Sequence, residues 1–387
     1  MASVGIIAEY NPFHNGHLYQ IQEIKKKYKD ATIIIAMSGN FTQRGEPAII
    51  DKWTRASLAI KNGADLVVEI PYAFTTQSAD YYSYAGITLL ENLKVDKLIF
   101  GSESNNIEDI TEIAKAELEN EDFDKLVKIY SKFGYNYPTA LSLTLKDLTG
   151  KVINTPNDIL GITYIKTILK NNYNIKPETI KRTNDYHDKT ITGTISSATS
   201  IRENINDLEK IKTAIPKNTY KALQNNIIHR REDYYTYLKY KILTDTNLEQ
   251  YHLVDQDLAS KLKKYITSSK NYEELIQKAK SKNETYSKIS RALLQILCNY
   301  TKEEHKKHKK ITYIRLLGFN KNGKNYLNQI KKEMTLPIIS KISRNQDSML
   351  TLELNTTKIY TLPYKNQEEE FKKEYQCNLY RKEDEDD

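Results

Sequence analysis

In the first hundred residues, two patterns of apolar and polar positions alternate along the chain. Continuous apolar, β-prone runs are typical of strands covered on both faces of a sheet. Apolar residues that recur every three or four positions, as Leu18, Ile21, Ile24 and Tyr28 do, are typical of a helix. This alternation predicts an α/β fold with a doubly wound parallel sheet. We expect strands at 4–8, 31–37, 66–70 and 97–100, and helices at 18–29, 51–62 and 78–92.

The remaining chain is different in pattern. Residues 105–150 look acidic and helical, as an insertion packed on the sheet would, and residues 205–310 look helical throughout. A strand at 311–317, a helix at 325–332 and a strand at 350–362 predict a small C-terminal α/β cap, followed by an acidic tail at 383–387. We therefore expect three domains, at 1–204, 205–310 and 311–387.

Two histidines stand where the first predicted strand passes into the first helix. His14 and His17 are three residues apart, so their rings lie on one face of the first helical turn, and we expect both to be exposed. That turn presents unpaired backbone N–H groups and the positive end of the helix dipole. Gly16 lacks a Cβ and would let a ligand approach the backbone. The arrangement suits a polyphosphate; polar surface is the alternative.

A second polar segment, residues 195–202, begins a later helix. Ser196, Ser197 and Thr199 offer hydroxyl groups, and Arg202 adds a planar cation suited to phosphate. Helix capping would explain the serines equally well. Near the first segment, Arg44, Lys52 and Arg55 are further candidates for phosphate or carboxylate contacts, or else helix-surface charges.

The positive charge of the chain is concentrated in one part of it. The net charge of +8 divides into −2 for residues 1–204, +14 for 205–364 and −4 for 365–387. A basic region beside a near-neutral one favours a polyanionic partner, nucleic acid above all, over a merely solvated surface. The tyrosines between 234 and 240, mixed with lysines, could stack on bases or simply pack the helix. The run at 302–310 could contact phosphate or be a solvated linker.

Composition excludes several classes of protein. Mean hydropathy is −0.65 and no run of eighteen apolar residues exists, so neither a membrane span nor a membrane partner is expected. Two cysteines make no disulfide framework, and no His/Cys cluster suggests a metal site, so a reducing cytoplasm is the expected location. The sequence leaves the oligomeric state open.

The segments quoted above resemble a known family. HNGH at 14–17 matches the HxGH signature of the HIGH nucleotidyltransferases, and ISSATSIR at 195–202 is similar to their second phosphate motif, with Ala198 departing from it. The longer strings EYNPFHNGH and SGNFTQRGEPAIIDKWTRA resemble the bacterial tRNA(Met) cytidine acetate ligases. The resemblance implies a HIGH-type nucleotidyltransferase fold, with ATP as substrate, together with Mg²⁺ bound to its phosphates but no dedicated protein metal site. It also implies acetate and elongator tRNA(Met) as partners.

The resemblance also implies roles for single residues. His14, His17 and Arg202 would be catalytic. Asn157, in the segment PNDILG, and Arg182, after a strand near 180, would contact the nucleotide. The full expected nucleotide-binding set is Ile7, Ala8, Glu9, Tyr10, Asn11, Pro12, Phe13, His14, Asn15, Gly16, His17, Leu18, Tyr19, Gln20, Gly101, Asn157, Arg182, Ser196, Ser197 and Thr199.

Three functions remain in competition at this point. The resemblance implies a ligase that converts acetate to acetyl-AMP and acetylates N4 of the wobble cytidine, with the basic region 205–364 holding the tRNA. An adenylyltransferase that joins AMP to a small phosphorylated metabolite would leave that basic region unexplained. A non-catalytic RNA-binding protein would not need both motifs.

Overall fold

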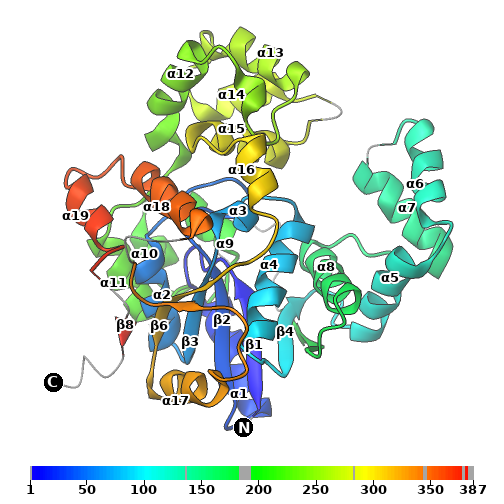
Figure 1. Ribbon diagram of the computed structural model, residues 1–387, viewed down its shortest axis with the longest axis vertical. Helices are drawn as coiled ribbons and strands as arrows, with labels where there is room; N and C mark the ends of the chain where they lie inside the picture. The colour runs from blue at the N-terminus through cyan, green and yellow to red at the C-terminus, as the bar shows by residue number, and fades with distance from the viewer. Residues whose placement is uncertain are drawn as a thin grey trace.

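The computed structural model describes residues 2–135, 137–182, 193–281, 284–342, 347–376 and 380–381 (Figure 1). The expected acidic tail at 383–387 lies outside the described residues, as does the segment that follows Arg182 up to residue 192.

The predicted doubly wound sheet is confirmed. Its parallel strands run in the order β5-β4-β1-β2-β3, so the order reverses at the first strand. In such sheets ligands bind where the order reverses, outside the carboxyl ends of the strands. The strands are β1 (Ser3–Ala8), β2 (Thr32–Ser38), β3 (Leu66–Ile70), β4 (Lys97–Ser102) and β5 (Lys176–Lys181).

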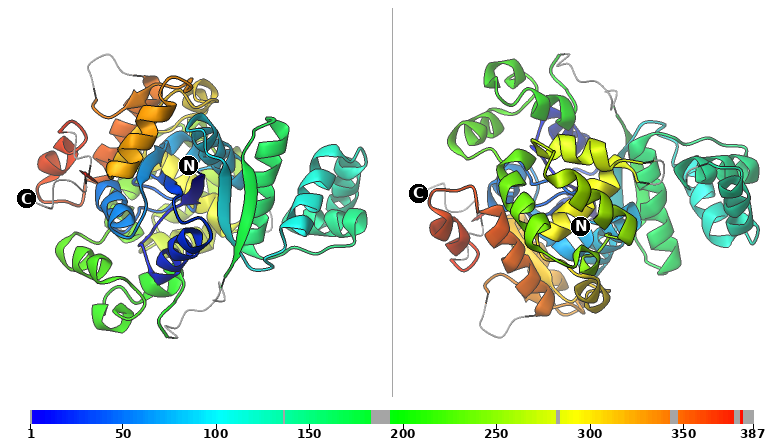
Figure 2. Two further views of the ribbon diagram at one scale, coloured as in Figure 1. Left: turned by 90° about the horizontal axis from the view of Figure 1, so that it is seen from below. Right: turned by 90° about the horizontal axis from the view of Figure 1, so that it is seen from above.

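Helices cover both faces of the sheet, as the left view of Figure 2 shows from below. Alternate residues of β2 divide between two cores: Ile33 and Ile35 face one, Ile34 and Ala36 the other. Local signals define these helices; for example, Asp51 caps the second by accepting N–H bonds from Trp53 and Thr54. They are α1 (Asn15–Lys27) and α2 (Lys52–Lys61) on one face, and α3 (Tyr72–Thr75), α4 (Ala79–Asn92), α8 (Pro156–Lys170) and α17 (Lys321–Ile330) on the other.

The acidic insertion is helical, as expected, and projects to the right in Figure 1. It consists of α5 (Ile107–Glu119), α6 (Phe123–Lys132) and α7 (Tyr137–Thr149). Its first helix packs against α8, whose N-terminus reaches the carboxyl edge of the sheet.

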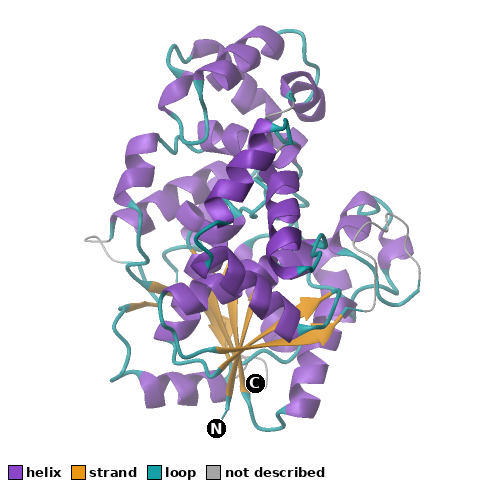
Figure 3. Ribbon diagram, turned by 90° about the vertical axis from the view of Figure 1, so that its right-hand side faces the viewer, coloured by secondary structure: helices purple, strands orange, loops and turns teal. Residues whose placement is uncertain are grey.

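The basic helical region has two parts. The first, α9 (Ala198–Glu203), α10 (Leu208–Ile211) and α11 (Lys217–Asn225), shares a core with α1 and α2. The second stands above the carboxyl edge, where Figure 3 shows helices and no strands. It comprises 3₁₀ turns η1 (Arg231–Tyr234) and η2 (Leu248–Gln250), with α12 (Tyr235–Thr244), α13 (Gln256–Ile266), α14 (Tyr272–Ala279), α15 (Tyr286–Leu297) and α16 (Lys302–Lys307).

The C-terminal region differs from the expected cap. Its strands β6 (Ile314–Phe319), β7 (Ile338–Ile339) and β8 (Tyr380–Arg381) extend the main sheet, with β6 antiparallel to β3. The strand predicted at 350–362 was wrong, because α18 (Ser348–Tyr360) occupies it, followed by α19 (Gln367–Lys372). Leu350, Leu352 and Leu354 alternate like a strand, yet Asp347 caps a helix by accepting the Met349 N–H at 2.7 Å.

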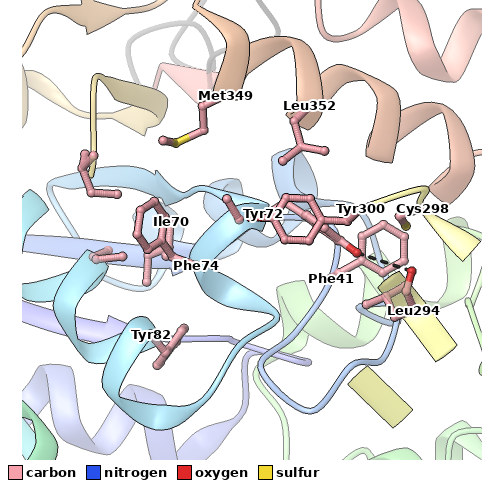
Figure 4. Packing of buried hydrophobic residues seen from close by; sticks show 14 of the residues in the cluster. Phe41, Ile70, Tyr72, Phe74, Tyr82, Leu294, Cys298, Tyr300, Met349 and Leu352 are labelled. Atoms are coloured by element: carbon pink, nitrogen blue, oxygen red, sulfur yellow. Dashed lines mark hydrogen bonds between the residues drawn. The ribbon is translucent and has the colours of Figure 1, made fainter. Parts of the chain in front are cut away.

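One aromatic core joins the sheet to both later regions. Figure 4 shows Tyr72 and Phe74 of α3 between Leu294 and Tyr300, near the end of α15, and Met349 and Leu352 of α18. Tyr72 and Tyr300 meet edge to face at 5.8 Å between ring centroids. The second helical part is therefore attached to the sheet through a buried core.

Candidate functional site

A cavity of about 470 Å³ opens where the strand order reverses. Segments that are far apart in the sequence line it: the loop after β1, the end of β4, the start of α8, the end of β5 and the start of α9. Most of the residues expected to bind nucleotide line this one cavity. They are Ile7, Ala8, Glu9, Tyr10, Asn11, His14, Gly16, His17, Tyr19, Gln20, Gly101, Asn157, Arg182, Ser196, Ser197 and Thr199, together with Arg202.

Four residues of the expected set do not line the cavity. Pro12 and Phe13 are buried, and Phe13 packs at 4.9 Å from the ring of Tyr10. Asn15 donates from Nδ2 to the carbonyl oxygens of Thr194 and Thr213, at 2.7 and 2.8 Å. Leu18 packs against the core beneath. Their contacts support the loop and the start of α1, and their binding to a nucleotide stays a prediction.

The two histidines form a reciprocal cap on α1. His14 Nδ1 accepts the Gly16 N–H at 3.1 Å, and His17 Nδ1 accepts the His14 N–H at 3.2 Å. The rings stack with centroids 3.7 Å apart. Because both Nδ1 atoms accept, each neutral ring carries its proton on Nε2 and can donate it.

The expectation that both histidines are exposed was wrong for His14, which is only 6% exposed. Its ring packs over Gly16, where a Cβ would come within 2.9 Å of His14 Cε1. A Cβ at position 16 would therefore force the His14 ring to shift, a constraint that spacing alone did not reveal.

Burial keeps these imidazoles neutral. Burial first, then Arg182 and Arg202, lowers the pKa of His14 to about 3. Burial, His14 and Arg182 lower the pKa of His17 well below its usual range. Near neutral pH both rings are therefore uncharged N–H donors, and the arginines carry the positive charge of the cavity.

The two motifs meet directly. Arg202 donates from an Nη atom to the carbonyl oxygen of Asn11 at 2.8 Å, across 191 positions of sequence. Ser197 caps α9 by accepting the Ser200 N–H at 3.1 Å, so for this residue the capping interpretation holds. Ser196 differs: its Oγ is buried in the cavity lining and has no hydrogen-bond partner among the described residues. A buried hydroxyl of this kind points to a ligand.

The opposite side of the cavity is a polar cluster at the ends of β4 and β5. Asn157 donates to the carboxylate of Glu103, and Arg182 Nε lies 3.6 Å from the same carboxylate. Asp158 accepts the Ser104 N–H at 2.9 Å and ties this turn to α8. Burial lowers the pKa of Arg182, and Glu103 opposes that shift. Across the described chain its Nε lacks a hydrogen-bond partner, although it is buried.

Two of the basic residues suggested as phosphate contacts serve the fold instead. Lys52 is fully buried and pairs with Glu69 and Glu374 at 2.8 and 2.9 Å. Arg55 is fully buried and donates to the carbonyl oxygens of Glu9 and Ser38, at 2.7 and 3.0 Å. Both suggestions were wrong. Arg44, by contrast, lines the cavity.

Sequence reasoning missed several residues of the lining. Gln43 comes from the loop after β2, within the string that carries the family resemblance, and Tyr82 comes from α4, outside any motif. An edge-of-sheet argument could have found Gln43, because the loop between the strand predicted at 31–37 and the helix predicted at 51–62 follows the carboxyl end of that strand. The other missed residues are Ala79, Phe100, Pro156, Ile159, Leu160, Tyr164, Ile180, Lys181, Ile195 and Ala198.

Metal-binding side chains do not gather here. Within the described ranges, no group of three or more His, Cys, Asp or Glu residues could hold a metal ion. None of the helices described is long and apolar enough to cross a membrane.

Comparison with known proteins relates the whole chain to one group. The family model of the HIGH Nucleotidyl Transferase matches residues 1–375. The tRNA(Met) cytidine acetate ligase of Geobacillus sp. (strain WCH70) is 40% identical over 359 residues, covering 89% of this chain and 90% of that protein. The tRNA(Met) cytidine acetate ligase of Caldicellulosiruptor saccharolyticus is 39% identical over 380 residues, covering 94% and 95%.

Two solved structures are similar to this chain over nearly its whole length. The crystal structure of Thermotoga maritima TmcAL (apo, form I) superimposes with a TM-score of 0.90 at 29% identity, covering 98% of this chain and 100% of that chain. The same protein bound with alpha-thio ATP gives a TM-score of 0.88 at 28% identity, with the same coverage.

Proposed function

The chain belongs to the HIGH nucleotidyl transferase family, and from that premise we propose that it is an ATP-dependent ligase that acetylates N4 of the wobble cytidine in elongator tRNA(Met). Its substrates are ATP, acetate and tRNA, and its products are AMP, pyrophosphate and a tRNA that carries N4-acetylcytidine. A location in the cytoplasm, where these substrates meet, is part of the proposal.

The contact between Arg202 and the Asn11 carbonyl carries this proposal. It brings the second phosphate motif against the loop of the first, beside His14 and His17 and in one cavity. Anion-binding groups from both motifs thus surround one space large enough for a bound nucleotide. Either motif alone could have been only a helix cap.

In the first step, an acetate oxygen attacks the α-phosphorus of ATP. The bond from that phosphorus to the bridging oxygen breaks, and pyrophosphate leaves as acetyl-AMP forms. His14 and His17 donate from Nε2 to phosphate oxygens, and Arg202 neutralises charge that builds up as the bond breaks. Ser196 and Thr199 donate hydroxyl hydrogen bonds, and Gly101, Asn157 and Arg182 hold the remainder of the nucleotide. No protein nucleophile is needed, because positioning and charge stabilisation suffice.

In the second step, the exocyclic amine of cytidine attacks the acetyl carbonyl carbon. The bond from that carbon to the phosphate oxygen breaks, AMP leaves, and the amine loses a proton. The tRNA lies against the basic region, net +14 over residues 205–364, part of which stands above the carboxyl ends of the strands (Figure 1). Of its clustered tyrosines, Tyr234 and Tyr235 are buried, whereas Tyr237 and Tyr240 are 42% and 69% exposed and available to stack on bases.

Magnesium would be held by the substrate. Mg²⁺ needs several oxygen ligands, and no acidic cluster among the described residues offers a protein cage. The phosphate oxygens of ATP, with water, are the ligands that fit, and neither step above is assigned to the ion.

The proposal is tested by incubating the protein with ATP, labelled acetate and bulk tRNA, and then analysing the nucleosides. We expect label in N4-acetylcytidine, with release of AMP and pyrophosphate. AMP joined to another small molecule would point to the adenylyltransferase alternative, and absence of ATP consumption would overturn the enzymatic assignment.

A further inference from the structure

The loop between β2 and α2, residues 39–47, supplies two side chains to the cavity that belong to neither phosphate motif. Gln43 and Arg44 both line the cavity. The loop is a tight turn, closed by the Thr42 N–H donating to the Glu46 carbonyl at 2.9 Å and the Ala48 N–H donating to the Asn40 carbonyl at 2.9 Å. Its shape therefore decides where Gln43 and Arg44 lie.

The tip of this loop rests on the helical region. Ser290 of α15 donates from Oγ to the Gly45 carbonyl at 3.1 Å, and Ser290 is fully buried. Gly45 has φ of +76°, a conformation that glycine adopts without strain. A Cβ at this position would lie 2.6 Å from the Arg291 backbone nitrogen. Backbone thus packs on backbone across 245 positions of sequence.

An ion pair joins the same two regions. Arg231 of η1 lies 3.3 Å from the Glu46 carboxylate, with the two side chains 26% and 17% exposed. Arg231 is itself held in place, because it donates to the Tyr286 hydroxyl and lies 5.8 Å from the ring centroid of Tyr272. Contacts within the helical region therefore orient Arg231 toward the loop.

Glu46 also acts on the cavity. Burial lowers the pKa of Arg202, while Glu46 and Glu9 raise it and Arg44 and Arg231 lower it. The Glu46 carboxylate is therefore close enough to influence a cavity arginine, and Arg231 is the cation that engages it. A carboxylate released from that pair would compete with phosphate for Arg202 and Arg44.

A further connection reaches the loop through Gln43. Gln43 donates from Nε2 to the Gln77 carbonyl at 3.1 Å, and its backbone N–H donates to Glu9 at 2.8 Å. Gln77 in turn hydrogen-bonds through Oε1 to His252 Nε2 at 2.8 Å. Contacts from the helical region thus reach the loop directly at Gly45 and Glu46, and through Gln77 at Gln43.

We propose that Arg231 is a positioning residue for the cavity: by engaging Glu46 it holds loop 39–47 in place and neutralises a carboxylate that would otherwise compete for the arginines that bind the substrate anions. The helical region then has a role in ATP binding, and in adenylation, that does not require tRNA. The activity readout of this idea rests on the proposed function, whereas the binding and exchange readouts do not.

The experiment compares Arg231→Ala with Arg230→Ala. Arg230 is its exposed neighbour, which contacts Asn206 and Asp233 within its own region. We expect Arg231→Ala to raise the Kd for ATP about fivefold or more, to slow acetate-dependent release of pyrophosphate without tRNA, and to speed hydrogen exchange in residues 39–47. Arg230→Ala should leave all three unchanged.

Rescue separates the electrostatic role from general loss of structure. Adding Glu46→Gln to Arg231→Ala removes the released carboxylate, so ATP affinity should return to within about twofold of the wild type. Unchanged affinity and exchange in Arg231→Ala would overturn the proposal, as would a double variant no better than the single one. If the wild type binds ATP but forms no acetyl-AMP, the proposed function fails while the binding and exchange results still decide this inference.

Discussion

The two walls of the cavity are built in different ways. The motif wall, formed by residues 9–20 and 196–202, is shaped largely by short-range side-chain caps: His14 and His17 together cap the first turn of α1, and Ser197 caps α9. The loop wall, residues 39–47, is closed by its own backbone hydrogen bonds, but contacts with α15 and η1 also hold it from outside. The difference implies that short motifs in the sequence are enough to locate the residues of the motif wall. The position of the loop wall depends in addition on a region about two hundred residues further along the chain.

The largest effect should come from the motif wall. His14→Asn retains an N-cap acceptor but removes the imidazole, so it separates the cap from the chemistry. We expect adenylation to fall about 10²- to 10³-fold, the usual cost of removing one donor to developing charge. Tm should change by only a few degrees.

The adenylation rate is measured as acetate-dependent pyrophosphate release, and Tm is measured by thermal unfolding. His14→Ala is the comparison variant, because it loses both the cap and the N–H donor. If His14→Asn kept its activity while His14→Ala lost stability alone, the ring would be only a cap.

A smaller effect is expected at the loop wall, from Gly45→Ala. A left-handed backbone costs a residue with a Cβ about 1–2 kcal/mol, and overpacking against the Arg291 backbone adds about 1–3 kcal/mol. Gly150→Ala is the matched control, because Gly150 has φ of +70° with nothing within 4 Å of its Cβ position. The free energy of unfolding, measured in urea, should fall more for Gly45→Ala.

ATP affinity should weaken for Gly45→Ala only. Equal destabilisation by the two substitutions, with equal ATP affinity, would mean that α15 does not shape the loop.

The third prediction concerns acid and applies to buried histidines of both the motif wall and the helical region. Burial first lowers the pKa of His14 to about 3, of His252 to about 3 and of His305 to about 4. Because each folded pKa lies below the unfolded value of about 6.5, the unfolded chain binds more protons in acid, and stability is lost as pH falls below that value. Each such histidine should cost about 1 kcal/mol at pH 5.5.

Urea unfolding at pH 7.5 and 5.5 measures this loss. In His252→Asn, the loss of unfolding free energy between pH 7.5 and 5.5 should be smaller by about 1 kcal/mol, the contribution of one histidine. A free energy of unfolding that stays constant between the two pH values would show that these rings are not held neutral.

Local patterns were sufficient for much of the fold. The starts of β1 to β4 fall within one residue of their predicted positions, because uninterrupted apolar runs mark strands covered on both faces. The same reasoning failed at 350–362, where alternating leucines imitate a strand. There the chain forms a helix that packs on α3. Glu353 of this helix is buried, and its Oε2 accepts the Tyr72 N–H at 2.7 Å.

For the site, the sequence indicated the residues of the motif wall but not the arrangement of charge. Lys52 and Arg55 have the spacing of surface cations, yet tertiary packing buries both among acceptors. Whether a lysine or arginine faces a ligand or the core depends on which distant acceptors surround it, and no periodicity encodes that.

The sequence by itself determined the family, the parallel sheet and the two phosphate motifs, because caps, apolar runs and short motifs are interactions between residues near one another in the chain. Only the tertiary structure decided that Arg202 meets the loop after β1, that His14 is buried and neutral, and that Arg231 holds Glu46. Those properties arise from desolvation and from charges brought together across more than 180 residues, and they exist only once the chain has packed.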